Sequence, residues 1–158
     1  IALVEGPAFA GGFGIVCCSD VVIGTKDTKF SISESKIGLT PAQIAPYVVN
    51  RIGLRNAKKI ILLGTVLNGT QAYDFGVIDQ LAKDKLDLEA QFTSLRKTLE
   101  ACAPQATATT KDILINHGQQ EPSQIANFLA NKFADCLTGE EAKEGLKAFT
   151  EKRSPKWA

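Results

Sequence analysis

The fold of this chain is decided by the stretch Gly6-Pro7-Ala8-Phe9-Ala10-Gly11-Gly12-Phe13-Gly14-Ile15-Val16-Cys17-Cys18-Ser19-Asp20. An apolar run at residues 1–4 leads into it, and three glycines fall within positions 11–14, where a strand should turn into a helix. Glycine there lets the backbone approach a ligand closely. The helix that follows directs unpaired N–H groups and the positive end of its dipole at the turn. The stretch therefore predicts either a site for a developing negative charge, on a phosphate or a thioester oxygen, or a tight turn without a ligand.

Composition and charge are those of an ordinary globular chain. Its 158 residues are enough for one domain with a core, and 44% are hydrophobic and 22% charged. The formal net charge of +1 gives no reason to expect nucleic acid or an anionic membrane as the partner. No apolar run approaches the ~20 residues that a membrane span needs. We therefore expect no nucleic-acid partner and no membrane partner.

Cysteine use and the start of the chain carry two further expectations. The four cysteines fit no metal-ligand spacing, so we expect no metal site. Cys17 and Cys18 adjoin at an apolar helix start and are predicted to be reduced and buried, in a reducing compartment such as the bacterial cytoplasm or, in a eukaryote, the mitochondrial matrix. The chain opens at Ile1 on an apparent core strand and contains no methionine. We therefore expect it to be the later part of a longer protein.

Two kinds of pattern follow one another along the chain. The first part alternates strands, predicted at 1–4, 21–25, 29–32 and 77–81, with short helices at 14–19, 44–52, 56–63 and 70–75, the last with Thr70 as its N-cap. A loop is predicted at 33–43, and glycines at 53, 64 and 76 end helices. From residue 87 onward the spacing predicts only helices, at 87–103, 106–116, 122–137 and 139–152.

Four motifs, in this order, resemble the crotonase superfamily of enoyl-CoA hydratases and isomerases. They are the glycine-rich turn with its Cys18-Ser19-Asp20 end, residues 30–41, residues 63–78 and residues 144–153. The resemblance covers essentially the whole chain. It implies an α/β fold, with residues 1–86 as the C-terminal portion of a crotonase-like ββα spiral core and 87–158 as a helical tail for oligomerisation. It also implies that roughly a hundred residues are missing in front.

The resemblance implies chemistry on a thioester. Family members bind an acyl-CoA and stabilise its enolate in an oxyanion hole made of two backbone N–H groups. Gly11 would supply one of them, and the other would come from the missing part. An N–H group at a helix start is a preorganised donor, and losing one such donor typically costs ~2.7–4 kcal/mol of barrier. No cofactor is implied, because the substrate itself is the coenzyme A thioester.

The glutamates decide which reaction the resemblance implies. Family hydratases pair the oxyanion hole with two glutamates. Here only the second is present, as Glu34, while Gly14 stands at the position of the first. Family isomerases move a proton between carbons with the second glutamate alone. Without the resemblance, Glu34 would be taken for a solvated surface residue.

The segment after Glu34 favours a hydratase nevertheless. Residues 38–49 look most like the branch that hydrates 3-methylglutaconyl-CoA or isohexenylglutaconyl-CoA. The second carboxylate of such substrates would be fixed by Lys36, by Arg51 or by a residue of the missing part. We therefore expect a hydratase of a branched glutaconyl-type CoA, ahead of an enoyl-CoA isomerase that uses Glu34. A non-catalytic acyl-CoA-binding homologue is a third alternative.

Several more residues are predicted at the substrate. They are Gly12, Gly14, Ser33, Pro41, Phe149 and Lys152. Ser33 would hydrogen-bond Glu34, and Phe149 and Lys152 would contact the nucleotide end of CoA from the tail of a neighbouring subunit, unless they simply belong to an amphipathic helix and its end. The single histidine, His117, matches no catalytic position and is predicted to end a helix. We expect a homotrimer or a dimer of trimers.

Overall fold

A computed structural model describes residues 1–158 with the exception of 117, 119, 120 and 122. The prediction for His117 therefore lies outside the described residues. The chain separates into two compact units, Ile1–Ser94 (unit 1) and Leu95–Ala158 (unit 2), so their border lies inside helix α4 (Lys85–Glu100). The border predicted between residues 86 and 87 lies in the first turn of the same helix.

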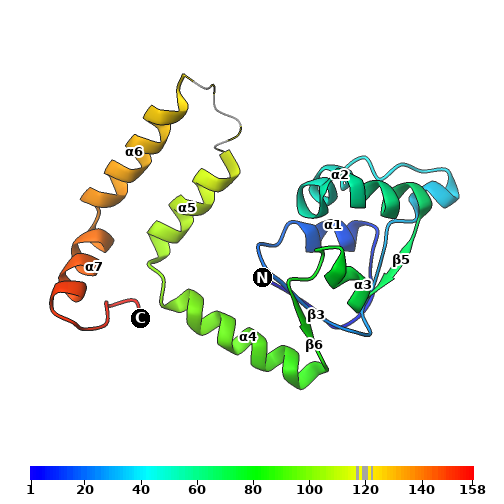
Figure 1. The fold of residues 1–158 in the computed structure, drawn as a ribbon, viewed down its shortest axis with the longest axis horizontal. Coiled ribbons are helices and arrows are strands. Elements are labelled where there is room, and N and C mark those ends of the chain that lie inside the picture. The colour runs from blue at the N-terminus through cyan, green and yellow to red at the C-terminus, as the bar shows by residue number, and fades with distance from the viewer. Residues whose placement is uncertain (117, 119–120, 122) are drawn as a thin grey trace. The chain divides into compact units, whose positions relative to one another are not determined.

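Unit 1 is an α/β structure with two three-stranded sheets (Figure 1). The first contains β1 (Ala2–Val4), β3 (Val22–Thr25) and β6 (Gln80–Ala82), all parallel and in the order β1-β3-β6. The second contains β2 (Ala8–Phe9), β4 (Lys29–Ser31) and β5 (Val66–Asn68); β4 pairs with β2 in parallel and with β5 antiparallel. Strand β3 is buried along its whole length, as expected for a central strand of a parallel sheet.

Helix α1 (Gly11–Cys17) packs between the second sheet and helix α2 (Ala45–Leu63). Phe13 on α1 and Phe30 on β4 are fully buried, with ring centroids 5.4 Å apart. This contact fixes the start of α1 against β4. Within α2, Gly53 has φ 73°, a left-handed conformation that glycine adopts at little cost. The predicted interruption of the helical region at Gly53 is therefore present.

Three local predictions are wrong. Helix α1 begins at Gly11 rather than at residue 14, because the turn into it is made at Ala10. A 3₁₀ helix, η1 (Glu34–Ile37), occupies part of the predicted loop. The N-cap of α3 (Gly69–Asp74) is Asn68 rather than Thr70, because Asn68 and Gln71 form a reciprocal capping box with hydrogen bonds of 2.9 and 3.0 Å.

The paired cysteines differ from each other. Cys17 is buried, and burial raises the pKa of its thiol to about 12. Cys18, predicted to be buried as well, is exposed, because it follows the last turn of the short helix α1. A thiol that stays protonated is a poor nucleophile, so Cys17 acts as a core residue.

Unit 2 is helical, with α5 (Pro104–Asn116), α6 (Ile125–Thr138) and α7 (Glu140–Thr150) after the end of α4. Helices α5 and α6 lie side by side (Figure 1). The Glu141 carboxylate accepts hydrogen bonds from the N–H groups of Gln105 and Ala106, at 2.9 and 3.0 Å, and so caps α5. Trp157 lies against Gly145, with Cη2 3.2 Å from where a Cβ would stand. A mostly apolar hollow of about 590 Å³ lies among these helices.

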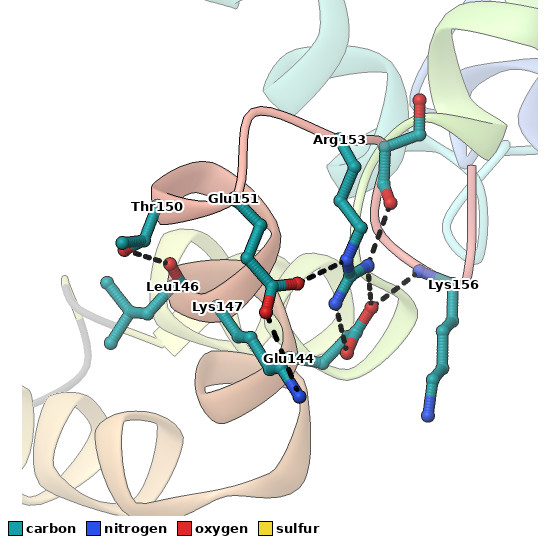
Figure 2. Close-up of polar contacts among 8 residues, drawn as sticks. Glu144, Leu146, Lys147, Thr150, Glu151, Arg153 and Lys156 are labelled. Carbon is teal, nitrogen blue, oxygen red and sulfur yellow. Dashed lines mark hydrogen bonds and ion pairs between the residues drawn. The ribbon is translucent and has the colours of Figure 1, made fainter.

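An ion-pair cluster lies at the C-terminal end of unit 2 (Figure 2). The Arg153 guanidinium donates to the carboxylates of Glu144 and Glu151, each at 2.7 Å, and Glu144 also accepts from the Lys156 N–H at 3.1 Å. The hydrogen bond from Arg153 lowers the pKa of Glu144 from its ordinary value of 4.5. The cluster therefore binds the last residues of the chain to α7.

The lowered pKa of Glu144 predicts a pH dependence of stability. A carboxylate whose pKa is lower in the folded state stabilises the fold above its unfolded value of 4.5, and this contribution is lost as the pH falls through the folded value. Unfolding by urea should show Glu144→Gln less stable than the unaltered protein near neutral pH, with the difference shrinking below pH 4.5. A difference that stays constant with pH would show that the Glu144 charge plays no part.

Candidate active site

Two turns leave the second sheet of unit 1 at the same edge. Strands β2 and β4 are parallel, with Phe9 opposite Ser31, and the Ala10 N–H donates to the Ser31 carbonyl at 2.9 Å. Beyond these residues, the first chain segment enters α1 at Gly11 and the second enters η1 at Glu34. Because carboxyl ends of parallel strands share an edge, Gly11 and Glu34 are brought to one region of the molecule. Ligands in α/β sheets bind at such edges.

The turn into α1 is strained at Ala10. Its φ of 50° and ψ of −122° lie in a region that residues with a Cβ rarely adopt. The hydrogen bond to Ser31 and the packing of Phe13 hold it there. Such conformations persist only where the surroundings enforce them, and they cluster at functional sites. The strain turns the chain sharply, so that α1 starts immediately beyond the sheet.

The start of α1 offers donors with space in front of them. The first i→i−4 hydrogen bond of the helix runs from the Gly14 N–H to the Ala10 carbonyl, at 3.2 Å, so the N–H groups before it have no such partner within the helix. Gly11 and Gly12 are exposed, and a Cβ at either would meet no atom within 4 Å. Packing within this chain therefore does not require glycine at either position, and the open space suits a ligand atom that approaches the backbone.

Glu34 is the carboxylate at this edge. It is the first residue of η1, it is half-buried, and its Oε2 atom is buried with no hydrogen-bond partner among the described residues. A buried carboxylate oxygen without a partner is costly, so its presence points to a role outside stability. Its backbone is held in place, since the Glu34 carbonyl accepts from the Leu39 N–H at 3.0 Å.

Ser31 is a site residue to which the sequence analysis assigned no role. It is the last residue of β4, its side chain is buried, and Oγ has no partner within the described part of the chain. The buried hydroxyl and the Glu34 carboxylate thus lie three residues apart on the segment that leaves β4. The only sequence signal is the alternation of polar and apolar residues along β4, which does not separate a buried serine from a solvated one.

The other predicted residues in unit 1 have different surroundings. Ser33 is the exposed N-cap of η1 and makes no capping hydrogen bond, and the Oε2 of Glu34 has no partner among the described residues, so the expected bond to that oxygen is absent. Pro41 lies in the turn before α2, where its carbonyl accepts from the N–H groups of Ile44 and Ala45 at 3.1 and 2.9 Å. Gly14 is buried against Ile44. Roles of these residues in substrate binding stay predictions.

The two basic side chains suggested for a substrate carboxylate have different surroundings. Arg51 is 10% exposed and donates to Asp79 and to the carbonyls of Ser19 and Val77, both at 3.0 Å. These contacts argue against Arg51 as a ligand for substrate. The methylene stem of Lys36 lies over Gly64 at the end of α2, with Cε 2.6 Å from where a Cβ would stand. Arg51 is thus engaged within the fold, whereas Lys36 is exposed and its role toward a substrate carboxylate stays a prediction.

Phe149 and Lys152 belong to unit 2. Phe149, near the end of α7, is 84% exposed. Lys152 has φ 53° and forms the left-handed turn after α7, in which the N–H groups of Lys152 and Arg153 donate to the carbonyls of Phe149 and Ala148 at 3.2 and 3.1 Å. This is a Schellman motif with lysine where glycine is usual. Contacts of both residues with CoA stay predictions.

The left-handed backbone conformation of Lys152 leads to a prediction about stability. Lys152→Gly should raise the free energy of unfolding by about 0.5–1 kcal/mol, because glycine adopts positive φ without the penalty of a Cβ. Urea unfolding should show no such gain for Lys152→Ala, which removes the charge but keeps the strain. Equal stability of the two variants would contradict the prediction. If Lys152 binds CoA through its charge, both variants should weaken CoA binding.

Two negative findings complete the description. Across the described residues, no group of three or more His, Cys, Asp or Glu side chains is arranged to hold a metal ion. In the same part of the chain, no helix combines the length and the apolar character needed to cross a bilayer.

Comparison with known proteins places this arrangement in a family. The sequence model of the enoyl-CoA hydratase/isomerase family matches residues 1–158. An enoyl-CoA hydratase/isomerase from Marinobacter aquaeolei is 40% identical over 99% of this chain and 59% of its own, with a TM-score of 0.94. Pseudomonas aeruginosa AtuE is 39% identical over 99% of this chain and 61% of its own, with a TM-score of 0.96. The enoyl-CoA isomerase/hydratase fer4 of Mycosarcoma maydis is 30% identical over 98% of this chain and 57% of fer4.

The chain therefore belongs to the enoyl-CoA hydratase/isomerase family and has its α/β crotonase fold. It spans between 50% and 62% of the length of curated relatives that it matches.

Proposed function

We propose that the full-length protein adds water to the double bond of an enoyl-CoA, with a branched glutaconyl-type CoA as the substrate. The observation that carries the proposal is the buried Oε2 of Glu34, which has no hydrogen-bond partner among the residues that the structure describes, at the sheet edge where α1 begins. A carboxylate with a free buried oxygen is a proton acceptor, and a helix start with open space in front of it is an anion site. Acid–base chemistry on a thioester needs both.

In the proposed reaction, the Gly11 N–H donates to the thioester oxygen. Glu34 accepts a proton from water while the water oxygen bonds to the β-carbon, and the electrons of the double bond move toward the thioester oxygen as an enolate. The α-carbon then takes a proton from the Glu34 carboxylic acid, and the carboxylate is restored. One water molecule is consumed and all charges balance. The preorganised N–H group stabilises the negative charge as it develops.

The glutaconyl part of the proposal is supported by the resemblance of residues 38–49 to the branch that hydrates such substrates. The contacts of the Arg51 guanidinium with Asp79 and two carbonyls argue against Arg51 as the residue that binds a second carboxylate of the substrate. Lys36, or a residue in the rest of the full-length protein, is therefore the partner proposed for that carboxylate.

A specific observation favours a second candidate, an enoyl-CoA isomerase. Gly14 stands at the position of the first family glutamate and is packed against Ile44. The first glutamate is therefore absent, and there is no space for its side chain. A single carboxylate is sufficient to take a proton from one carbon and return it to another. A third candidate, an acyl-CoA-binding homologue without activity, would keep the helix-start site but would not use Glu34.

The experiment is a substrate panel on the full-length protein: 3-methylglutaconyl-CoA, crotonyl-CoA and a 3-enoyl-CoA, each in water enriched in heavy oxygen. Label in the product of the glutaconyl substrate supports the hydratase. Double-bond migration without label identifies the isomerase. Binding of CoA esters without turnover identifies the non-catalytic homologue.

We also infer a homotrimer or a dimer of trimers in a reducing compartment, with acyl-CoA as the small-molecule partner. Exposed apolar side chains on unit 2, such as Phe133, Leu146 and Phe149, support further packing of the helical tail. The four cysteines are free, which suits the bacterial cytoplasm or the mitochondrial matrix.

A further inference from the structure

Gly14 has no room for a side chain. An ideal Cβ built on its backbone would stand 2.5 Å from Ile44 Cγ2 and 2.8 Å from Ile44 Cβ. Both distances are far below ordinary van der Waals contact. The second atom is the branch point next to the backbone, so a rotation about the side-chain bond of Ile44 does not clear the space.

Ile44 is also held by its backbone. Its N–H donates to the Pro41 carbonyl at 3.1 Å, and its own carbonyl accepts from the Val48 N–H at 3.1 Å. It is the N-cap of α2, and its side chain packs on the core of unit 1. Moving Ile44 therefore means moving the start of α2.

The place that Ile44 fills belongs to the candidate site. Residues three apart on a helix lie on the same face, so Gly14 shares a face of α1 with Gly11, whose N–H is the proposed donor. A side chain at position 14 would leave the helix one turn beyond that donor. The Ile44 methyl group stands there instead, which gives this side of the site an aliphatic wall.

We propose that Ile44 is a specificity-determining residue: by filling the place of a side chain at position 14, it keeps Glu34 as the carboxylate for every proton step and presents a hydrocarbon surface beside the oxyanion donor. This inference rests on the proposed function for its chemical meaning. The Gly14–Ile44 contact itself is measurable without any substrate.

The first test is a stability cycle on the full-length protein with Gly14→Ala, Ile44→Gly and the double variant. Gly14→Ala should lower Tm by about 3–10 °C, because it overpacks the contact. In the Ile44→Gly background, the same change should shift Tm by less than about 1 °C or raise it, because the obstructing Cβ and methyl group are gone and the remaining Cα lies 3.8 Å from where the new Cβ would stand. Gly12→Ala is the matched control on the same helix: a Cβ there meets no atom within 4 Å, so Tm should not fall.

The second test measures chemistry. The variant Gly14→Glu/Ile44→Gly should hydrate crotonyl-CoA at least about tenfold faster than Ile44→Gly, because a second carboxylate then has space in the site. Equal rates in two folded variants would overturn the assignment of specificity. An equal loss of Tm for Gly14→Ala in both backgrounds would show that Ile44 does not obstruct position 14. If the glutamate variant does not fold, this Tm comparison alone decides whether the proposal stands. Activity that survives Glu34→Gln would contradict the proposed function while leaving the Tm cycle as a valid measure of the contact.

Discussion

Replacing Glu34 by glutamine should lower the turnover of the full-length protein by ~10²-fold or more. Glutamine keeps the shape of the side chain and removes its capacity to accept a proton. The expected loss applies to hydration and to isomerisation alike, because Glu34 is the proton acceptor in both proposals. Steady-state rates with the best substrate of the panel measure it.

The same substitution should leave the fold intact, which separates a catalytic role from a structural one. The Oε2 of Glu34 has no partner among the described residues, so glutamine breaks no hydrogen bond at that atom and relieves the cost of a buried charge. We expect the unfolding midpoint to stay the same or to rise. Glu89→Gln, at an exposed position on α4, is the matched control and should change neither rate nor stability. Full activity of Glu34→Gln would rule out Glu34 as the acid–base group.

Replacing Arg51 by methionine should lower the free energy of unfolding by about 3 kcal/mol. The guanidinium donates to the Ser19 carbonyl beyond α1, to the Val77 carbonyl and to Asp79, whose carboxylate also accepts from the Val22 N–H at 2.7 Å. Its loss leaves these acceptors without their charged donor and removes one link between α2 and the segments around the first sheet. Urea unfolding should show the change in the midpoint.

Two variants make this prediction specific. Arg55→Met changes an exposed arginine of the same helix and should cost less than about 0.5 kcal/mol. Arg51→Lys keeps the charge but lacks the planar fork that reaches three acceptors, so most of the loss should remain. A stability of Arg51→Met equal to that of Arg55→Met would show that the cluster contributes nothing measurable.

The sequence patterns predicted the elements whose signals are local. The β-branched run over β3 and the alternation over β4 identify strands, and Gly53 and Gly64 mark breaks because both have positive φ. Strands β2 and β5 were missed, since β2 is two residues inside the glycine-rich stretch and β5 runs into the Asn68-Gly69 turn. The helix start at Gly11 was missed because glycine is a poor helix former, and the packing of Phe13 against Phe30 overrides that preference.

In the candidate site, too, the sequence predicted the features with local signals and missed those that depend on distant contacts. Gly11 and Glu34 were predicted from motifs, and their place at one sheet edge follows from the pairing of β2 with β4. The buried hydroxyl of Ser31, the strain at Ala10 and the contact of Ile44 with Gly14 depend on the packing of distant segments, which no local pattern encodes. The engagement of Arg51 with Asp79 is of the same kind, because the two residues lie 28 positions apart.

Trp157 against Gly145 has a consequence for spectroscopy. The single tryptophan of this chain lies in unit 2, and its two tyrosines, Tyr47 and Tyr73, lie in unit 1. Indole and phenol chromophores absorb and emit at different wavelengths, so each unit carries its own intrinsic optical probe. Selective excitation of the indole during denaturation should report the melting of the helical tail alone. Whether the two units unfold together or one after the other can then be followed in one unlabelled sample.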